Sequence, residues 1–213
     1  MNKVEIFGPG FSTFVRTLML ACEEKSIPYR QHMEWQGEPV AMHSDSHFQL
    51  HPFGKVPVLI DDGRVLTETC SILRYLEAVY PQHPLQPADA FDRALLDQWC
   101  GYISGYVDQA LIRRYLLEFV FPKGEGGTVR EDRVERALPG LHEVLAMLEK
   151  QLADQPFLMG DTLTLADLLL LPMLDYLLAM PQSRELMLGY SALVSYTERL
   201  RQRPSAQLVL AAS

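Results

Sequence analysis

Residues 51–76 read HPFGKVPVLIDDGRVLTETCSILRYL, and this pattern predicts a strand, a tight turn, a second strand and a helix. Residues 56–60 are apolar and rich in β-branched side chains, which favour a strand. Asp62 and Gly63 predict a two-residue hairpin turn, because glycine tolerates the positive φ angle that such a turn requires. Apolar side chains then recur at helical spacing over residues 72–76, after the capping residue types at 67–69.

The same stretch has the features of a ligand site. Pro57 cannot donate a hydrogen bond to a sheet, so we expect it at a strand start or edge, with the backbone of Val56 available to an extended ligand. The helix that follows begins with unpaired N–H groups and a partial positive charge, which suit a carboxylate. Glu68 beside it matches an ammonium group. A ligand with a peptide backbone and an α-amino-acid end would satisfy all three features.

Residues 54–59 (GKVPVL) and 68–76 (ETCSILRYL) resemble the glutathione-binding half of the glutathione S-transferases. The family pattern is V-P-x-L followed by E-S-x-A-I-x-x-Y-L, and Thr69 replaces the usual serine while keeping a hydroxyl group. The resemblance implies that glutathione contacts Val56, Pro57, Glu68 and Thr69, and that the peptide bond before Pro57 is cis. The alternative interpretation of the motif is an ordinary corner between a hairpin and a capped helix.

A second motif lies near the N-terminus, where a predicted strand at residues 3–7 is followed by Gly-Pro-Gly and a helix. Ser12 and Arg16 resemble the serine-type transferases, with bacterial theta-like or phi-like members as the nearest pattern. In that family the serine hydroxyl stabilises the glutathione thiolate, so the resemblance makes Ser12 the catalytic residue. Thr13 is a competing hydrogen-bond donor to the thiolate. The alternative interpretation of Ser12 is that it only caps the helix. Arg16 is expected to pair with acidic groups as a structural residue.

Further site residues are expected around this centre. His43 and Lys55 are candidates for the glycine carboxylate of glutathione, with His47 and His51 as competitors for the same role. The resemblance places Phe11, Tyr106 and Arg113 in the pocket for the second substrate. Phe11 stands where some bacterial relatives carry a cysteine, which argues against chemistry through a protein thiol. The chain's three cysteines are widely spaced and show neither a zinc pattern nor a C-x-x-C motif, so no metal is expected.

The domain organisation follows from composition. The segment 81–87, PQHPLQP, is rich in proline and predicts a linker. Before it, residues 1–80 predict the order βαβ, loop, ββα, which is a thioredoxin-like α/β domain. After it, residues 88–213 predict an all-helical bundle. The whole chain would therefore be a two-domain protein of the glutathione transferase type.

Two details of the helical part are also predicted. Thr164 and Asp167 form a capping pair, and GDTLTLAD at 160–167 resembles the segment that opens the buried core helix of transferase C-terminal domains. Asp167 is therefore interpreted as structural. Ser191 is expected to cap a last helix that Pro204 closes.

Composition limits the partners. The chain has 213 residues, a hydrophobic content of 48%, a charged content of 22% and a net charge of −8. These values are typical of a soluble globular protein, and the negative charge argues against nucleic acid and anionic membranes. The apolar run at 163–180 contains two aspartates and a proline, which favours a buried helix over a membrane span. No signal-peptide pattern stands at residues 1–7, so the cytoplasm is the expected location.

The resemblance implies a detoxifying enzyme that attaches glutathione, its co-substrate, to small apolar electrophiles, usually as a homodimer. A glutathione-dependent isomerase or dehalogenase on the same fold is an alternative. A non-catalytic binding module is a second alternative, from another functional class. The presence of Ser12, Pro57, Glu68 and Thr69 together favours the enzyme.

Overall fold

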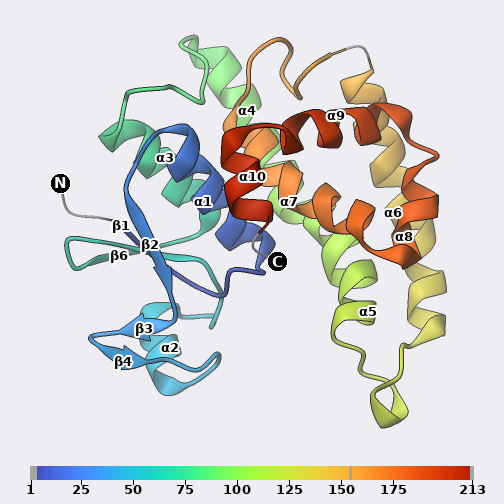
Figure 1. The fold of residues 1–213 in the computed structure, drawn as a ribbon, viewed down its shortest axis with the longest axis horizontal. Coiled ribbons are helices and arrows are strands. Elements are labelled where there is room, and N and C mark those ends of the chain that lie inside the picture. Colours follow the sequence, from blue (N-terminus) through green and yellow to red (C-terminus); the bar gives the residue numbers. More distant parts are fainter. Residues whose placement is uncertain (1–3, 154, 212–213) are drawn as a thin grey trace. The chain divides into compact units, whose positions relative to one another are not determined.

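The structure is a computed structural model that describes residues 4–153 and 155–211. The chain divides into two units, one formed by residues 1–87 with 202–213 and the other by residues 88–201. Both units are drawn in Figure 1.

The first unit is built on a four-stranded mixed sheet with the strand order β2-β1-β5-β6. Strand β1 is parallel to β2 and antiparallel to β5, and β5 is antiparallel to β6. This is the predicted βαβ-ββα order of a thioredoxin-like domain, and the prediction is confirmed. The strands and the helices between them are β1 (Val4–Phe7), α1 (Thr13–Glu24), β2 (Tyr29–His32), β5 (Val58–Asp61), β6 (Arg64–Thr67) and α3 (Thr69–Val79).

Side chains alternate between the two faces of this sheet. Phe7, Val58 and Ile60 form a buried cluster with Leu50 from the short helix α2 (Asp45–Leu50). Helices α1 and α3 pack against each other, α1 on β1 and α3 on β6. Figure 1 shows α1 and α3 above the sheet and α2 below it. Helix α2 therefore lies close to the point where β1 ends and β5 begins.

Residues 29–35 contribute to two separate sheets. Strand β2 ends at His32, and β3 (Glu34–Trp35) instead pairs with β4 (Glu38–Pro39) in a separate two-stranded sheet. The chain leaves the first sheet at Met33, whose carbonyl oxygen accepts a hydrogen bond from the N–H of Val40 at 2.9 Å. Residues 29–35 contain no glycine or proline, so the sequence gives no signal of this break.

The predicted hairpin turn is confirmed, because Asp62 and Gly63 have φ angles of 50° and 75° between β5 and β6. The expected side-chain cap at the start of α3 is wrong. Glu68 occupies the N-cap position with φ 69° and makes no capping hydrogen bond through its side chain. The Glu68 side chain is 70% exposed.

The segment 81–87 contains neither a helix nor a strand. A buried ion pair holds part of it against the helices of the first unit. Lys25 donates to the Glu77 carboxylate at 2.6 Å and to the carbonyl oxygens of residues 82–83 at 3.2 Å. Glu77 also accepts a hydrogen bond from the N–H of Leu85 at 3.2 Å. The segment is therefore irregular in structure but fixed in place.

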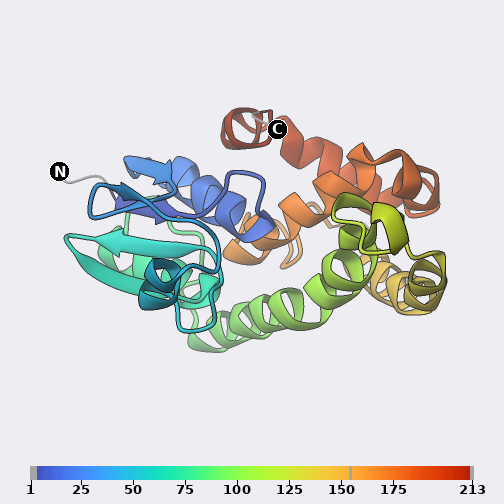
Figure 2. The ribbon, with the colours of Figure 1, turned by 90° about the horizontal axis from the view of Figure 1, so that it is seen from below.

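The second unit is helical, as predicted. In Figure 2 its first helices follow one another as one long rod, which contains a π-helical stretch. The elements are α4 (Ala90–Tyr102), the π-helix η1 (Ile103–Leu116), α5 (Leu117–Val120), the 3₁₀ turn η2 (Glu125–Gly127), α6 (Glu131–Leu152), α7 (Leu165–Ala179), α8 (Pro181–Met187) and α9 (Ser191–Arg201).

Helix α7 forms the core of this unit, and nearly all its side chains are buried. Its predicted capping pair is confirmed, because Asp167 accepts hydrogen bonds from the N–H and the hydroxyl of Thr164, both at 2.8 Å. The carboxylate also accepts from Leu158 N–H and from the Tyr196 hydroxyl. Burial raises the pKa of Asp167, and these hydrogen bonds oppose the rise. Asp167 thus ties the start of α7 to α9.

Among the described residues, no single helix has the length and apolar character needed to cross a membrane. The pair α7 and α8, which bends by 107°, passes that test only when both are taken together.

The expectation that Pro204 closes the last helix is wrong. Pro204 instead begins a further helix, α10 (Pro204–Leu210), since the first turn of a helix does not need the missing N–H. Helix α10 packs on α1, and Arg203 donates two hydrogen bonds of 2.7 Å to the Glu24 carboxylate. Residues 202–213 therefore group with the first unit, which differs from the predicted division into 1–80, 81–87 and 88–213.

Candidate active site

The strand register places the two predicted glutathione motifs together. Phe7, the last residue of β1, pairs with Val58, and Val58 pairs with Thr67 at the end of β6. The loop that follows β1, the residues that precede β5 and the residues that follow β6 therefore meet at one edge of the sheet. These are the segments that carry Ser12, Val56 with Pro57, and Glu68 with Thr69.

Gly8 brings the loop after β1 close to Val56. Its φ angle is 145°, which favours glycine, and a Cβ atom there would lie 2.5 Å from Val15 Cγ2 and 3.0 Å from Val56 Cβ. A side chain at this position would force the loop and Val56 apart. The sequence indicates this glycine only as a strand breaker, because its packing against Val15 and Val56 arises from the tertiary structure.

Ser12 is the N-cap residue of α1, and its hydroxyl oxygen accepts a hydrogen bond from Val15 N–H at 3.5 Å. The side chain is half-buried, whereas the competing Thr13 is only 8% exposed. Ser12 is thus the more accessible of the two candidate donors. Arg16 is buried, and its Nε donates to the carbonyl oxygen of Gly10 at 3.0 Å, so it holds the loop that precedes Ser12.

Val56 lies just before the paired part of β5, which starts at Val58. The peptide bond between Val56 and Pro57 is cis, as the resemblance implies. Pro57 is buried and Lys55 is exposed. The backbone of Val56 therefore stands at the sheet edge beside an exposed cation.

The three candidate histidines have different surroundings. His43 is exposed and lies against Gly54, where a Cβ atom would be 3.1 Å from His43 Cδ2. His47 and His51 are buried. His51 Nδ1 accepts a hydrogen bond from Phe53 N–H at 3.1 Å, which stabilises the turn that leads to Lys55. Of the three, only His43 is presented to solvent near Lys55.

Glu68 and Thr69 lie at the start of α3, with Thr69 buried and the Glu68 carboxylate exposed. Glu68 Oε1 is 3.8 Å from His51 Nε2. Burial lowers the pKa of His51, the charge of Glu68 opposes this, and the charge of Lys55 lowers it further. With its pKa lowered, His51 is mainly neutral at pH 7.

The residues predicted for the second-substrate pocket lie in different units. Phe11 is exposed in the first unit, next to Ser12. Tyr106 is exposed on η1 of the second unit. Arg113 Nε donates to Asp108 at 2.9 Å, a spacing of five residues that fits a π-helix. A pocket that combines these three residues stays a prediction.

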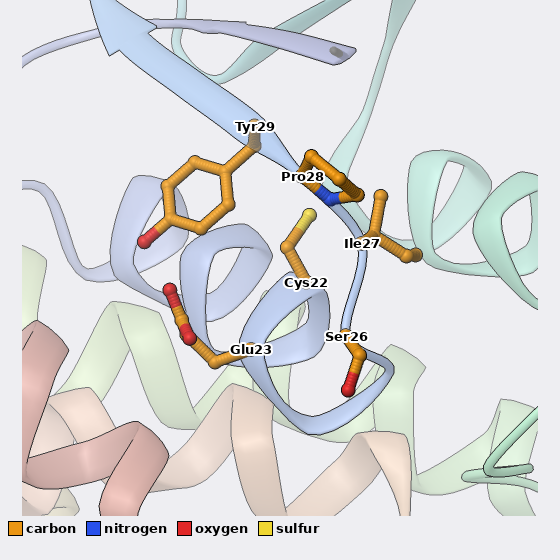
Figure 3. Close-up of a pocket in the computed structure, with 6 residues that line it drawn as sticks. All are labelled: Cys22, Glu23, Ser26, Ile27, Pro28 and Tyr29. Carbon is orange, nitrogen blue, oxygen red and sulfur yellow. The ribbon is translucent and has the colours of Figure 1, made fainter. Parts of the chain in front are cut away.

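A cavity of about 510 Å³ lies at the C-terminal end of α1 and is drawn in Figure 3. Its lining contains none of the predicted site residues and consists of Cys22, Glu23, Ser26, Ile27, Pro28 and Tyr29. Burial raises the pKa of Cys22 to about 12, so this thiol is protonated at neutral pH. The pKa of Tyr29 is raised by burial and by its hydrogen bond to Glu23. Neither group is a nucleophile at neutral pH.

Within residues 4–153 and 155–211, no group of three or more His, Cys, Asp or Glu side chains could hold a metal ion.

Comparison with known proteins supports the resemblance over both parts of the chain. Residues 11–79 match the glutathione S-transferase N-terminal domain, and residues 131–199 match the glutathione S-transferase C-terminal domain. A probable glutathione S-transferase GSTF1 from Oryza sativa subsp. japonica is 26% identical over 214 residues, which is 99% of this chain and 97% of the relative.

Solved structures show the same fold. Poplar glutathione transferase F1 superposes with a TM-score of 0.87 at 24% identity, with 100% of this chain and 98% of that chain covered. Glutathione S-transferase I from mais, in complex with an atrazine glutathione conjugate, gives a TM-score of 0.83 at 26% identity, with 99% and 97% covered. Two family domains in the expected order and this likeness over the whole length establish that the chain belongs to the glutathione S-transferase family.

Proposed function

We propose that the protein is a glutathione transferase that joins the glutathione thiolate to small apolar electrophiles. The observation that carries this proposal is the strand register, which brings Ser12, Val56 and Glu68 to one edge of the sheet. A relative of known structure is described with a glutathione conjugate, which supports the same class of product here.

Each part of glutathione has a partner of matching chemistry in this arrangement. The exposed Glu68 carboxylate suits the ammonium group of the γ-glutamyl end, and the start of α3 with the Thr69 hydroxyl suits its carboxylate. The backbone of Val56 suits the cysteinyl peptide group. His43 and Lys55 suit the glycine carboxylate, because both are exposed and carry N–H donors.

Ser12 would then act on the sulfur. Its hydroxyl donates a hydrogen bond to the thiolate, which stabilises the ionised form over the thiol. A hydrogen bond to a charged group contributes about 1.5–3 kcal/mol, and the N-terminus of α1 adds about 0.3–1 kcal/mol. Lowering the thiol pKa by about two units requires roughly 2.7 kcal/mol, so these contributions are sufficient.

In the reaction the thiol proton passes to solvent and the thiolate electron pair forms the new bond between sulfur and carbon. In a substitution, the leaving group departs with the electron pair of the bond that breaks. In an addition, no group leaves and the product takes up a proton instead. Ser12 keeps its own proton throughout. The rate gain comes from thiol activation and positioning, without a covalent protein intermediate.

A homodimer and a cytoplasmic location belong to this proposal and are supported by the family resemblance alone. Size-exclusion chromatography with light scattering measures the first directly.

The test compares Ser12→Ala with Thr13→Val, a control that removes the neighbouring hydroxyl but keeps the volume. Ser12→Ala should raise the pKa of the thiol of bound glutathione by about two units, so that turnover near neutral pH falls while binding persists. Part of the rate should return at high pH, where solvent deprotonates the thiol unaided. The thiolate absorbance of the binary complex against pH is the measurement.

A shift in Thr13→Val with none in Ser12→Ala would move the activating role by one residue. No shift in either variant would reject the serine mechanism. Glutathione binding by the wild type without turnover on a panel of electrophiles would favour the alternative of a binding module. Analysis of the products separates transfer from isomerisation and dehalogenation.

A further inference from the structure

His47 joins two segments of the proposed glutathione site through one buried ring. Its side chain lies in α2 and is fully buried. Nδ1 is 3.0 Å from the backbone nitrogen of His43, and Nε2 is 3.0 Å from the carbonyl oxygen of Lys55. The ring thus spans the gap between the two residues proposed to hold the glycine carboxylate.

The partners determine the protonation of this ring. A backbone N–H can only donate, so Nδ1 accepts the hydrogen bond from His43. A carbonyl oxygen can only accept, so Nε2 carries the proton and donates to Lys55. The imidazole is therefore neutral, with its proton on Nε2, and both of its polar atoms are used.

The ring itself is held in place by packing. Its centroid is 5.4 Å from that of Phe7, at the end of β1, and 6.4 Å from that of Phe48 on α2. Phe7 belongs to the buried cluster of the sheet. The position of the imidazole is therefore set by the core and transmitted to the two loops.

The hydrogen bond to Lys55 also orients Val56. The carbonyl group of Lys55 and the N–H of Val56 belong to one planar peptide unit, so fixing the first fixes the direction of the second. Loss of the ring nitrogens would leave the His43 N–H and the Lys55 carbonyl without their partner inside the protein, and the peptide unit would be free to rotate.

We propose that His47 is a positioning residue of the glutathione site, which holds His43, Lys55 and the Val56 peptide unit in the orientation that binds the cysteinyl-glycine part of glutathione. This inference rests on the proposed function. It assigns His47 no contact with glutathione, in contrast to the role of carboxylate ligand for which the sequence made it a competitor.

The test uses His47→Leu, which replaces the imidazole by an apolar side chain of similar volume and so removes both hydrogen bonds. We expect KM for glutathione to rise about tenfold, with kcat at saturating glutathione and KM for the electrophile within about twofold of the wild type. His47→Gln should recover much of the loss, because an amide offers one acceptor and one donor.

Leu50→Ala is the matched control. Leu50 is a buried hydrocarbon side chain on the same helix, so this variant should lower the melting temperature but leave KM for glutathione near the wild-type value. If His47→Leu does not fold, His47→Phe replaces it, because it keeps a ring against Phe7 and Phe48.

A second readout compares glutathione with γ-glutamylcysteine, which lacks the glycine residue, by calorimetry. His47→Leu should lose most of the wild-type preference for glutathione. A folded variant that keeps the wild-type KM and preference would overturn the role of His47, as would an equal rise in KM in Leu50→Ala. A wild-type protein that does not bind glutathione would instead overturn the proposed function itself.

Discussion

Glu68 shows at the scale of one residue how the site departs from ordinary local structure. Its φ angle of 69° is uncommon for a residue other than glycine, and its side chain is 70% exposed. A backbone in this region costs of order 1–3 kcal/mol and persists only where the surroundings enforce it. Here the carboxylate is exposed at the start of α3, where it is accessible to the ammonium group of the proposed ligand.

We therefore expect Glu68→Gln, which keeps the shape but removes the charge, to weaken glutathione binding by at least about 1.5 kcal/mol, or roughly tenfold. Glu38→Gln is the control, because Glu38 is an exposed glutamate of the same unit on β4. Calorimetry gives both affinities. Unchanged affinity in a folded Glu68→Gln protein would remove Glu68 from the proposed site.

At the scale of an element, helix α1 has a different role at each of its two termini. Its N-terminus presents Ser12, and its C-terminal turn holds α10 through Glu24. Glu24 accepts hydrogen bonds from Arg203 and Ser205. Burial by itself would raise the pKa of Glu24, but these hydrogen bonds and the charge of Arg203 together lower it.

A lowered carboxyl pKa stabilises the folded state above the unfolded pKa of about 4.3, and this contribution is lost as the pH falls through the folded value. Glu24→Gln should therefore reduce the free energy of unfolding by about 1–3 kcal/mol at pH 7. The difference from the wild type should shrink below about pH 4.

Denaturant unfolding at several pH values measures this difference, and hydrogen exchange over residues 204–210 reports whether α10 loosens. Glu23→Gln is the control, since Glu23 is the neighbouring carboxylate and faces Tyr29. A stability difference that persists unchanged at pH 3 would contradict the electrostatic account of α10.

At the scale of the whole chain, the buried ion pair of Lys25 and Glu77 connects residues that are 52 positions apart. It also binds the segment 82–85 to the C-terminal end of α1 and to α3. Both side chains are almost completely inaccessible, at 0% and 2%. Removal of one partner leaves the other charge buried without compensation, which typically costs about 3–5 kcal/mol.

Lys25→Met should accordingly lower the free energy of unfolding by about 3–5 kcal/mol, and Lys25→Met with Glu77→Leu should recover a large part of the loss. Arg30→Met tests an exposed ion pair of the same unit, with Glu5 at 3.3 Å, and should cost less than about 1 kcal/mol. Chemical denaturation decides between these outcomes. Equal costs for Lys25→Met and Arg30→Met would show that burial of the pair is not what stabilises the segment.

Local chemistry made much of the fold predictable from the sequence. The turn at Asp62 and Gly63 and the capping box of Thr164 and Asp167 depend on residues within three positions of each other. The order βαβ-ββα follows from apolar periodicity, which changes from strand to helix along the chain. The motif around Pro57 was recognisable for the same reason, because its residues are close in sequence.

Tertiary structure alone decided how distant residues meet. His43, His47 and His51 are indistinguishable as residue types, and only the packing of α2 on the sheet buries two of them and presents the third. The attachment of α10 to α1 depends on Arg203 and Glu24, which are 179 positions apart. Such contacts leave no periodic pattern in the sequence, because their energy depends on the surfaces that meet after the elements have formed.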